Sequence, residues 1–376
     1  MYQKKAHESN ESNIFKYIFE GHKSFVINDI VENLDISFPT VKKIISSFLK
    51  KNIILENKKV SNGVGRKAME YNFNDLFCYS IGILVSNKKI DFILTNACGK
   101  VLKKHSYLLE SDEFQNEFLS FTNNFITSLG SEIKEKLIGI GISIPGIVNK
   151  EGNFIEFTSK YKADLSFIEN LKSIFNVPIL IENESNLAAV AEAFLTKNSI
   201  YNNFMVLTIN DSIGISSFHQ ENLEKNFFFK AGRVHHMVIE SNGKLCECGT
   251  HGCWGGYVSN KALINDFKKY FPEIKNYNEI FNDKYFESKV GKILLDDYLK
   301  YLSIGIKNLL FFSNPEKLII SGKICLYKQF LLQELVNKIY KNHIFYRGPE
   351  TIEFSSFKEN GSIIGAAMFP IFDKLL

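Results

Sequence analysis

The spacing of hydrophobic residues divides the chain into a short helical segment and a longer segment in which strands and helices alternate. In residues 14–49, apolar residues recur three and four positions apart, which is the period of amphipathic helices. From Tyr79 onward, short apolar runs such as 79–85 and 137–144 are typical of strands, and longer helical stretches separate them. The pattern predicts an α/β body behind a small helical domain.

The helical segment has the order of a helix-turn-helix followed by a wing. A short helix is predicted at 27–34, and a second one runs from Phe38 to about Lys51, with Pro39 in its first turn and Ser37 as its N-cap. Two predicted strands then flank a basic, glycine-containing hinge. The alternative is a protein-interaction domain with solvated lysines. The residues that we expect at a DNA groove or backbone are Ser37, Thr40, Lys42, Lys43, Ser46, Lys58, Lys59, Arg66 and Lys67.

The excess positive charge lies in this same segment. Residues 1–73 contain 12 basic and 8 acidic residues, and the rest of the chain contains 33 of each, so the net charge of +4 belongs to the first fifth. This distribution favours nucleic-acid binding by the N-terminal part. No apolar run reaches the length of a membrane span, and the first 20 residues are polar, so we expect a cytoplasmic protein without a membrane partner.

Three of the six cysteines lie within eight residues, at 246–253. Disulfides are not expected in the cytoplasm, so the cluster favours metal binding. Three buried free cysteines are the alternative.

Five stretches together resemble the ROK family of repressors and sugar kinases. The resemblance implies an N-terminal winged helix-turn-helix at 1–73, followed by a two-lobed actin-like body of sugar-kinase type. The first lobe would span 74–185 and be completed by 361–376, and the second would span 186–360. The stretches are NGVGRKAMEYNFN (62–74), LIGIGISIPGIVN (137–149), PILIENESNLAAVAEAF (178–194), AGRVHHM (231–237) and CECGTHGCWGGYVS (246–259).

The resemblance also implies a zinc site made by His236, Cys246, Cys248 and Cys253. Four nitrogen and sulfur ligands with no open position are typical of a structural, tetrahedral zinc. His235 is a rival ligand to His236, but the spacing of the family's motif favours His236.

The two glycine-rich elements with which ROK kinases bind nucleotide are altered here. The first, G-x-D-x-G-G-T in the family, is GILVSNK (82–88), where Leu84 replaces the aspartate. Leucine cannot ligate magnesium. The second, T-x-G-T-G-x-G-G in the family, is TINDSIGISS (208–217), in which only Gly214 remains. We therefore expect no kinase activity.

The sugar site of the family is retained only in part. The family's Asn-Asp pair is Asn183–Glu184 here, with Glu184 at the general-base position, and Arg233 replaces a glutamate. Helix capping and surface polarity are the alternative for Asn183, Glu184 and Asn186. Because Arg233 reverses the local charge, one hypothesis is an anionic effector such as a sugar phosphate or sugar acid. Another is that no small molecule binds. The candidate ligand-binding residues are Asn183, Glu184, Arg233 and His236.

The sequence thus predicts a transcriptional repressor of ROK type that is not an enzyme. We expect a homodimer or homotetramer bound to a double-stranded DNA operator, with a sugar or anionic sugar derivative as the candidate effector and zinc as a structural cofactor. The alternatives are a sugar kinase with an accessory N-terminal domain and a DNA-binding protein without a ligand.

Overall fold

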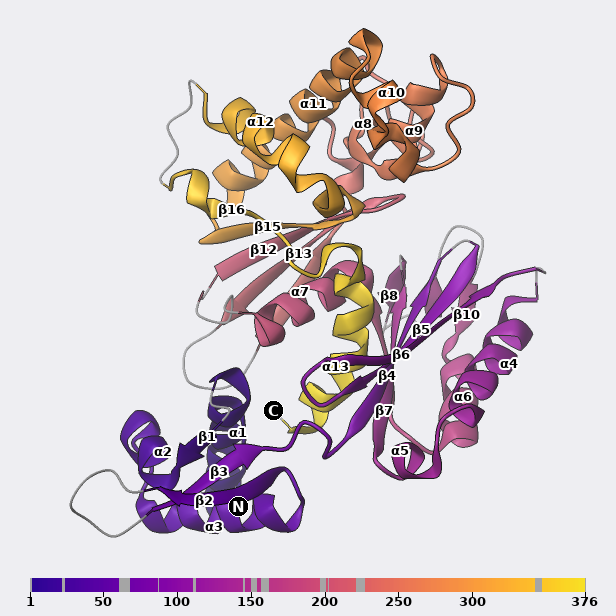
Figure 1. Ribbon diagram of the computed structural model, residues 1–376. Helices are drawn as coiled ribbons and strands as arrows, with labels where there is room; N and C mark the ends of the chain where they lie inside the picture. Colours follow the sequence, from indigo (N-terminus) through magenta and orange to yellow (C-terminus); the bar gives the residue numbers. More distant parts are fainter. Residues whose placement is uncertain are drawn as a thin grey trace. The chain divides into compact units, whose positions relative to one another are not determined.

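The computed structural model describes residues 2–375 except 22–23, 61–67, 87, 111–112, 145, 150–153, 157–161, 197–200, 202, 221–226 and 342–346. The chain forms two compact units (Figure 1). The first contains Met1–Glu182 and Ala366–Leu376, and the second contains Asn183–Gly365. In the described residues, no helix is both long and apolar enough to cross a membrane.

The N-terminal part of the first unit contains three helices and a three-stranded sheet of order β1-β3-β2. The helices pack through one apolar cluster, in which Phe15, Ile30, Ile44 and Phe48 are at most 2% exposed. Pro39 lies in the first turn of α3, as predicted. The elements are α1 (Tyr2–Gly21), β1 (Ser24–Val26), α2 (Ile27–Leu34), α3 (Phe38–Lys50), β2 (Ile54–Val60) and β3 (Ala68–Phe73).

The predicted capping role of Ser37 is wrong in one respect. Ser37 does occupy the N-cap position of α3, but its side chain makes no capping hydrogen bond. Its hydroxyl instead lies 2.9 Å from the hydroxyl of Thr40, so the two side chains form a hydrogen bond with each other.

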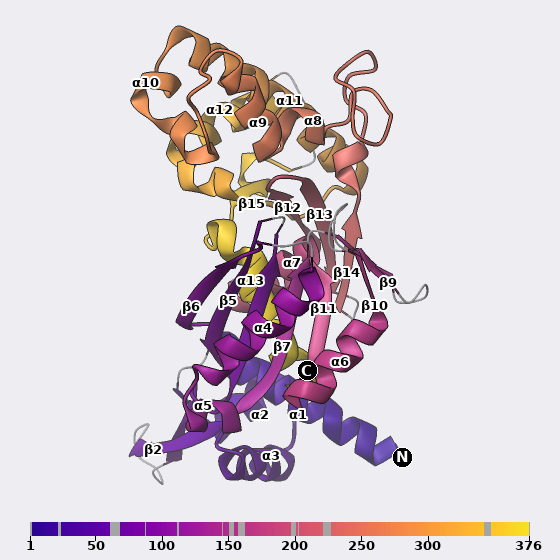
Figure 2. The same ribbon diagram turned by 90° about the vertical axis from the view of Figure 1, so that its right-hand side faces the viewer.

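A five-stranded sheet of order β11-β7-β4-β5-β6 forms the body of the first unit. Strand β7 carries Gly139 and Gly141 on one face, and a Cβ at either position would overlap α13, at Pro370 and Ala366 respectively. These glycines let α13 lie against the sheet, whereas α4 and α6 lie on its other face (Figure 2). The elements are β4 (Tyr79–Val85), β5 (Lys89–Asn96), β6 (Val101–Leu108), α4 (Phe114–Thr127), α5 (Ser131–Glu135), β7 (Leu137–Ile144), β8 (Ile147–Asn149), β9 (Phe154–Glu156), β10 (Lys162–Asp164), α6 (Leu165–Phe175), β11 (Ile179–Asn183) and α13 (Gly361–Leu375).

The second unit repeats this strand order in its own sheet, β14-β13-β12-β15-β16. In both sheets three antiparallel strands come first, and the next strand pairs parallel to the first of them. This duplication and the α/β composition agree with the predicted two-lobed, actin-like body. The elements are α7 (Glu184–Leu195), β12 (Asn203–Ile209), β13 (Ile213–Gln220), β14 (Phe227–Gly232), α8 (Gly255–Val258), α9 (Asn260–Lys268), α10 (Asp283–Phe286), α11 (Lys289–Ser313), β15 (Lys317–Gly322), α12 (Lys328–Tyr340) and β16 (Ile352–Phe354).

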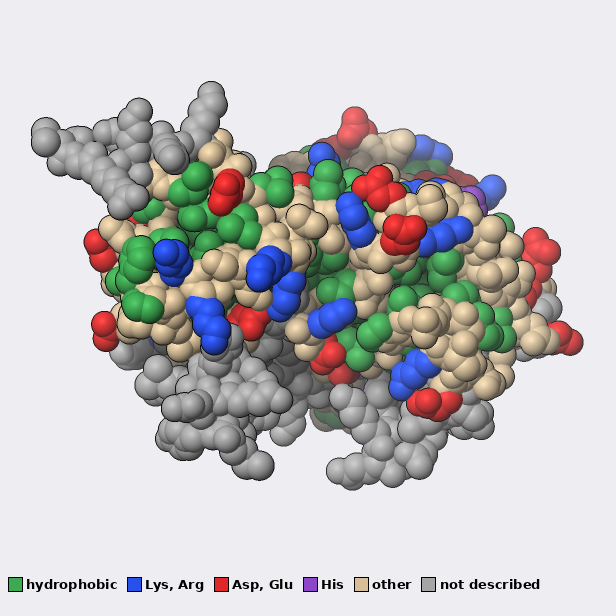
Figure 3. All heavy atoms as spheres, turned by 90° about the horizontal axis from the view of Figure 1, so that it is seen from below, with side chains coloured by type: hydrophobic (Ala, Val, Ile, Leu, Met, Phe, Trp, Pro, Cys, Tyr) green, Lys and Arg blue, Asp and Glu red, His purple; other side chains and the backbone are tan. Residues whose placement is uncertain are grey.

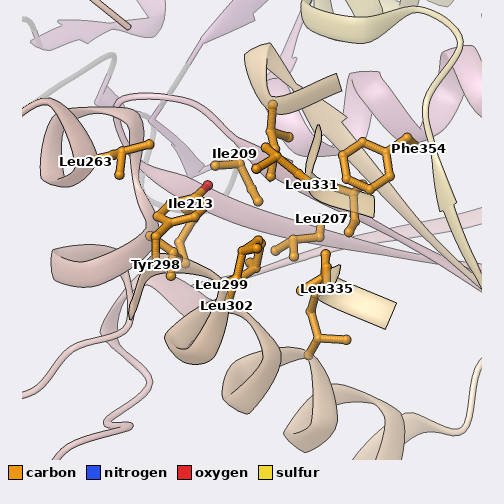
Figure 4. Close-up of a cluster of buried hydrophobic side chains, with 14 of the residues drawn as sticks. Leu207, Ile209, Ile213, Leu263, Tyr298, Leu299, Leu302, Leu331, Leu335 and Phe354 are labelled. Carbon is orange, nitrogen blue, oxygen red and sulfur yellow. The ribbon is translucent and has the colours of Figure 1, made fainter. Parts of the chain in front are cut away.

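The core of the second unit lies between its sheet and the helices α9, α11 and α12. Leu207 and Ile209 from β12 meet Leu302 from α11 and Leu335 from α12, and all four are fully buried (Figure 4). This packing gives β12 and its following turn a rigid base.

Candidate metal centre and ligand site

Four predicted metal ligands come together in the second unit. The ligand atoms of His236, Cys246, Cys248 and Cys253 all lie within 4.8 Å of one another. Nδ1 of His236 is 3.7 Å from Sγ of Cys246, and the sulfurs of Cys248 and Cys253 are 3.6 Å apart. Metal–ligand bonds of about 2.0–2.3 Å in a tetrahedron place the donors about 3.5–3.8 Å apart. The cluster therefore fits a metal ion held by four protein ligands.

A short glycine-containing loop brings these ligands together. Gly249 and Gly252 have φ of 84° and 79°, in the left-handed region that favours glycine. At Gly252 a Cβ would also overlap the backbone of Glu240. The loop is closed by a hydrogen bond of 2.9 Å from the Cys246 N–H to the Thr250 carbonyl oxygen.

The thiols of the cluster differ in their readiness to lose a proton. The backbone hydrogen bond with Thr250 lowers the pKa of Cys248 to about 6, whereas burial raises the pKa of Cys253 to about 12. Because a thiolate is the form that binds a metal, metal binding at this cluster would displace the proton of Cys253.

Trp254, which directly follows the candidate ligand Cys253, connects the candidate metal-binding loop to the core. Its side chain is fully buried, and its indole N–H donates to the carbonyl oxygen of Tyr301 on α11 at 3.0 Å. A Cβ at Gly305 would overlap the indole ring. Its place in the sequence already indicates such a role, because it is the only tryptophan of the chain and directly follows a candidate ligand.

Asn183 and Glu184 lie where α7 begins. The side-chain oxygen of Asn183 accepts a hydrogen bond from the Ser185 N–H at 2.8 Å, so Asn183 caps the helix. The Glu184 carboxylate is 7% exposed and accepts a hydrogen bond of 3.1 Å from the Asn210 side-chain amide. Burial raises the pKa of Glu184 to about 7, the bond from Asn210 lowers it, and the charge of Asp211 raises it.

The other candidate ligand residues follow β14. Arg233 and His236 are exposed. His235 lies with Nδ1 3.0 Å from the hydroxyl of Ser212, and its ring fills the space that a side chain at position 255 would need. Burial, with the nearby His236, lowers the pKa of His235, which favours the neutral imidazole.

The stretches 82–88 and 208–217, which match the family's nucleotide-binding elements, make contacts within the sheets and with α7. Leu84 on β4 pairs across the sheet with Asp91, whose carboxylate is bound by Lys89 and Ser106. Asn87 lies outside the described residues. Gly214, the one glycine kept in the second element, lies so close to Ser185 on α7 that a Cβ would meet its hydroxyl. The retained glycine therefore serves helix–sheet packing.

The candidate DNA-contacting residues of α3 lie on its outer side. Lys42 and Lys43 are exposed, and so is Ser46, whose hydroxyl donates to the Lys42 carbonyl oxygen at 2.8 Å. Figure 3 shows basic side chains on this side of the molecule among acidic, neutral and hydrophobic ones. Ser37 is exposed and Thr40 half-buried. Lys58 and Lys59 belong to β2, but their side chains are not described, and Arg66 and Lys67 lie outside the described residues.

Comparison with known proteins identifies the family. The profile of the ROK family matches residues 80–371. The xylose repressor of Bacillus spizizenii is 30% identical over 288 residues, covering 76% of this chain and 74% of that protein. The xylose repressor of Bacillus subtilis is 27% identical over 337 residues, covering 88% of this chain and 87% of that protein.

Solved structures show the same fold. A ROK family transcriptional regulator, described as a homolog of the E. coli MLC protein, has a TM-score of 0.79 at 18% identity and covers 97% of this chain and 96% of its own. A ROK glucokinase from Streptomyces griseus has a TM-score of 0.64 at 16% identity and covers 77% of this chain and 98% of its own. The regulator thus matches the N-terminal part as well as the body. The chain belongs to the ROK family, and its relatives place it among the family's transcriptional repressors rather than its sugar kinases.

Proposed function

We propose that the N-terminal part, residues 1–73, is a winged helix-turn-helix that binds a DNA operator through α3. The observation that supports this most is that α3 is apolar on its buried side and basic on its exposed side. Val41, Ile44 and Phe48 are at most 1% exposed, whereas Lys42 and Lys43 face outward. No acidic residue occurs from 36 to 55, so α3 itself carries no side chain that repels phosphate. The two lobes of the body are then 74–185 with 361–376, and 186–360.

The operator would be read by a homodimer or homotetramer, since a symmetric protein binds a symmetric site. Selection of fragments of the source genome on the purified protein tests this, with each bound site re-measured at two salt concentrations. A discrete, roughly palindromic site supports the proposal. Binding that depends on salt but not on sequence would refute operator recognition.

The effector would be a sugar bound by the second unit. Relatives named xylose repressors favour D-xylose, while the exposed Arg233 favours an anionic sugar derivative. The candidate contacts are Asn183, Glu184, Arg233 and His236. Titration of the protein–operator complex with D-xylose, D-xylose 5-phosphate and D-xylonate separates the two possibilities. Operator release by D-xylose alone would exclude the anionic effector.

The metal of the four-residue cluster would be a structural zinc. Its ligands leave no position open for a substrate, and the ion would hold the loop 246–253 beside Trp254. Metal analysis of the purified protein should find one zinc per chain. Protein free of metal but folded around Trp254 would contradict this role.

A further inference from the structure

The turn between β12 and β13 is hydrogen-bonded to Glu184 of the candidate ligand site and to His235, the residue before the candidate ligand His236. The turn is closed by a hydrogen bond of 2.9 Å from the Asn210 N–H to the Ser212 carbonyl oxygen. The side chain of Asn210 donates to Glu184 at 3.1 Å, and the hydroxyl of Ser212 lies 3.0 Å from Nδ1 of His235. Through Asn210 and Ser212, the turn therefore contacts both α7 and the segment that carries the candidate metal ligand His236.

The turn is itself held firmly in the second unit. The Asn260 N–H at the start of α9 donates to the carbonyl oxygen of Asn210 at 2.8 Å. On either side of the turn, Ile209 and Ile213 are buried in the core. Movement of the turn would break a helix contact and expose apolar surface, so its side chains have a fixed base.

The first three residues of α7 each contact the hairpin formed by β12 and β13. After the contact between Glu184 and Asn210, Ser185 packs on Gly214. Asn186 then accepts a hydrogen bond of 2.8 Å from the buried hydroxyl of Ser216. The relative position of α7 and the hairpin is thus fixed by packing and by polar contacts.

We propose that Asn210 and Ser212 are positioning residues of the effector site, which orient the Glu184 carboxylate and the His235 imidazole toward sugar hydroxyls. The identity of the effector rests on the proposed function, but the contacts of the turn do not. The matching stretch in kinase members of the family is glycine-rich and serves nucleotide phosphate. Here the side chains of Asn210 and Ser212 contact Glu184 and His235 instead.

The charge state of Glu184 should depend on Asn210. An amide that donates to a carboxylate stabilises its ionised form, whereas burial and the charge of Asp211 in the same turn favour the protonated form. Arg233 and His235 follow β14, the strand that pairs with β13 of the same hairpin. Removal of the Asn210 amide is therefore expected to raise the pH at which Glu184 titrates.

A nuclear magnetic resonance titration of the protein labelled with ¹³C at glutamate Cδ tests this without a ligand. The signal of Glu184 is assigned by its loss in Glu184→Gln. In Asn210→Ala the Glu184 midpoint should rise. Ser216→Ala is the matched control, because it removes a buried hydrogen bond between the same hairpin and α7 that does not involve Glu184. An unchanged midpoint in Asn210→Ala, or an equal rise in Ser216→Ala, overturns the proposal.

Calorimetric binding of D-xylose across pH supplies the second readout. Asn210→Ala should weaken binding about fivefold or more near neutral pH, and less at alkaline pH, where Glu184 is ionised in either protein. Ser212→Ala should also weaken binding, with rescue in Ser212→Thr, which keeps the hydroxyl. Unweakened binding in both alanine variants contradicts the positioning role. If the unaltered protein does not bind D-xylose, D-xylose is not the effector, and the Glu184 titration alone decides the role of Asn210.

Discussion

Glu184→Gln is expected to stabilise the second unit, and to do so more strongly at alkaline than at acidic pH. Burial raises the pKa of Glu184 from 4.5 to about 7. A carboxyl whose pKa is raised in the folded state binds its proton more tightly there than in the unfolded chain. Its contribution to stability is therefore fully present below pH 4.5 and is lost as the pH rises through 7. Glutamine has nearly the same shape and no proton to lose.

The size of the effect follows from the shift. Each unit of pKa corresponds to about 1.4 kcal/mol, so the complete loss amounts to about 3 kcal/mol. About 1.4 kcal/mol of this stability is already lost below pH 5.5, as the carboxyl of the unfolded chain ionises around its pKa of 4.5. Between about pH 5.5 and pH 8.5, proton linkage predicts that the stability advantage of Glu184→Gln grows by about 2 kcal/mol.

The chain offers a specific probe for this measurement. Trp254 is the only tryptophan, and it is fully buried in the second unit. Its fluorescence during urea unfolding therefore reports the unit that contains Glu184. The exposed Glu334 of α12 supplies the control Glu334→Gln, whose effect should stay within a few tenths of a kcal/mol at either pH. An advantage of Glu184→Gln that is constant with pH, or that shrinks as the pH rises, would refute the reasoning.

Three further predictions concern packing, metal and DNA. Gly305→Ala should destabilise the second unit by about 1–3 kcal/mol, because the added Cβ would overlap Trp254. The control Gly256→Ala should not, since no atom lies within 4 Å of its added Cβ. Equal urea midpoints for the two variants would contradict the packing. A strong chelator, or Cys253→Ser, should abolish bound zinc and shift the Trp254 emission to the red, and an unshifted spectrum would argue against a structural metal. Lys43→Ala should weaken operator binding and, if Lys43 contacts only phosphate, lower the salt slope by about one unit in a titration of affinity against salt; unaltered binding would exclude α3 as the reading helix.

Much of the architecture follows from the sequence because its causes are local. The apolar spacing in 38–50 makes an amphipathic helix wherever that segment lies, and Pro39 sets its beginning. The metal cluster also depends on a short stretch, since the ligands from His236 to Cys253 are joined by one loop whose glycines permit its turns. The loss of the nucleotide elements can likewise be read directly, because phosphate requires backbone that side chains do not obstruct.

The tertiary structure alone decided which of these local features meet. Asn210 lies 26 residues from Glu184 and Ser212 lies 23 residues from His235, and no pattern in the sequence pairs them. The glycines of β7 are needed only because α13, more than 200 residues later in the chain, packs against them. Periodicity determines how a segment is coiled or extended, because it acts through neighbouring residues. Contacts between distant segments depend on how all the buried surfaces pack together, and the surroundings of Glu184 are one result of that packing.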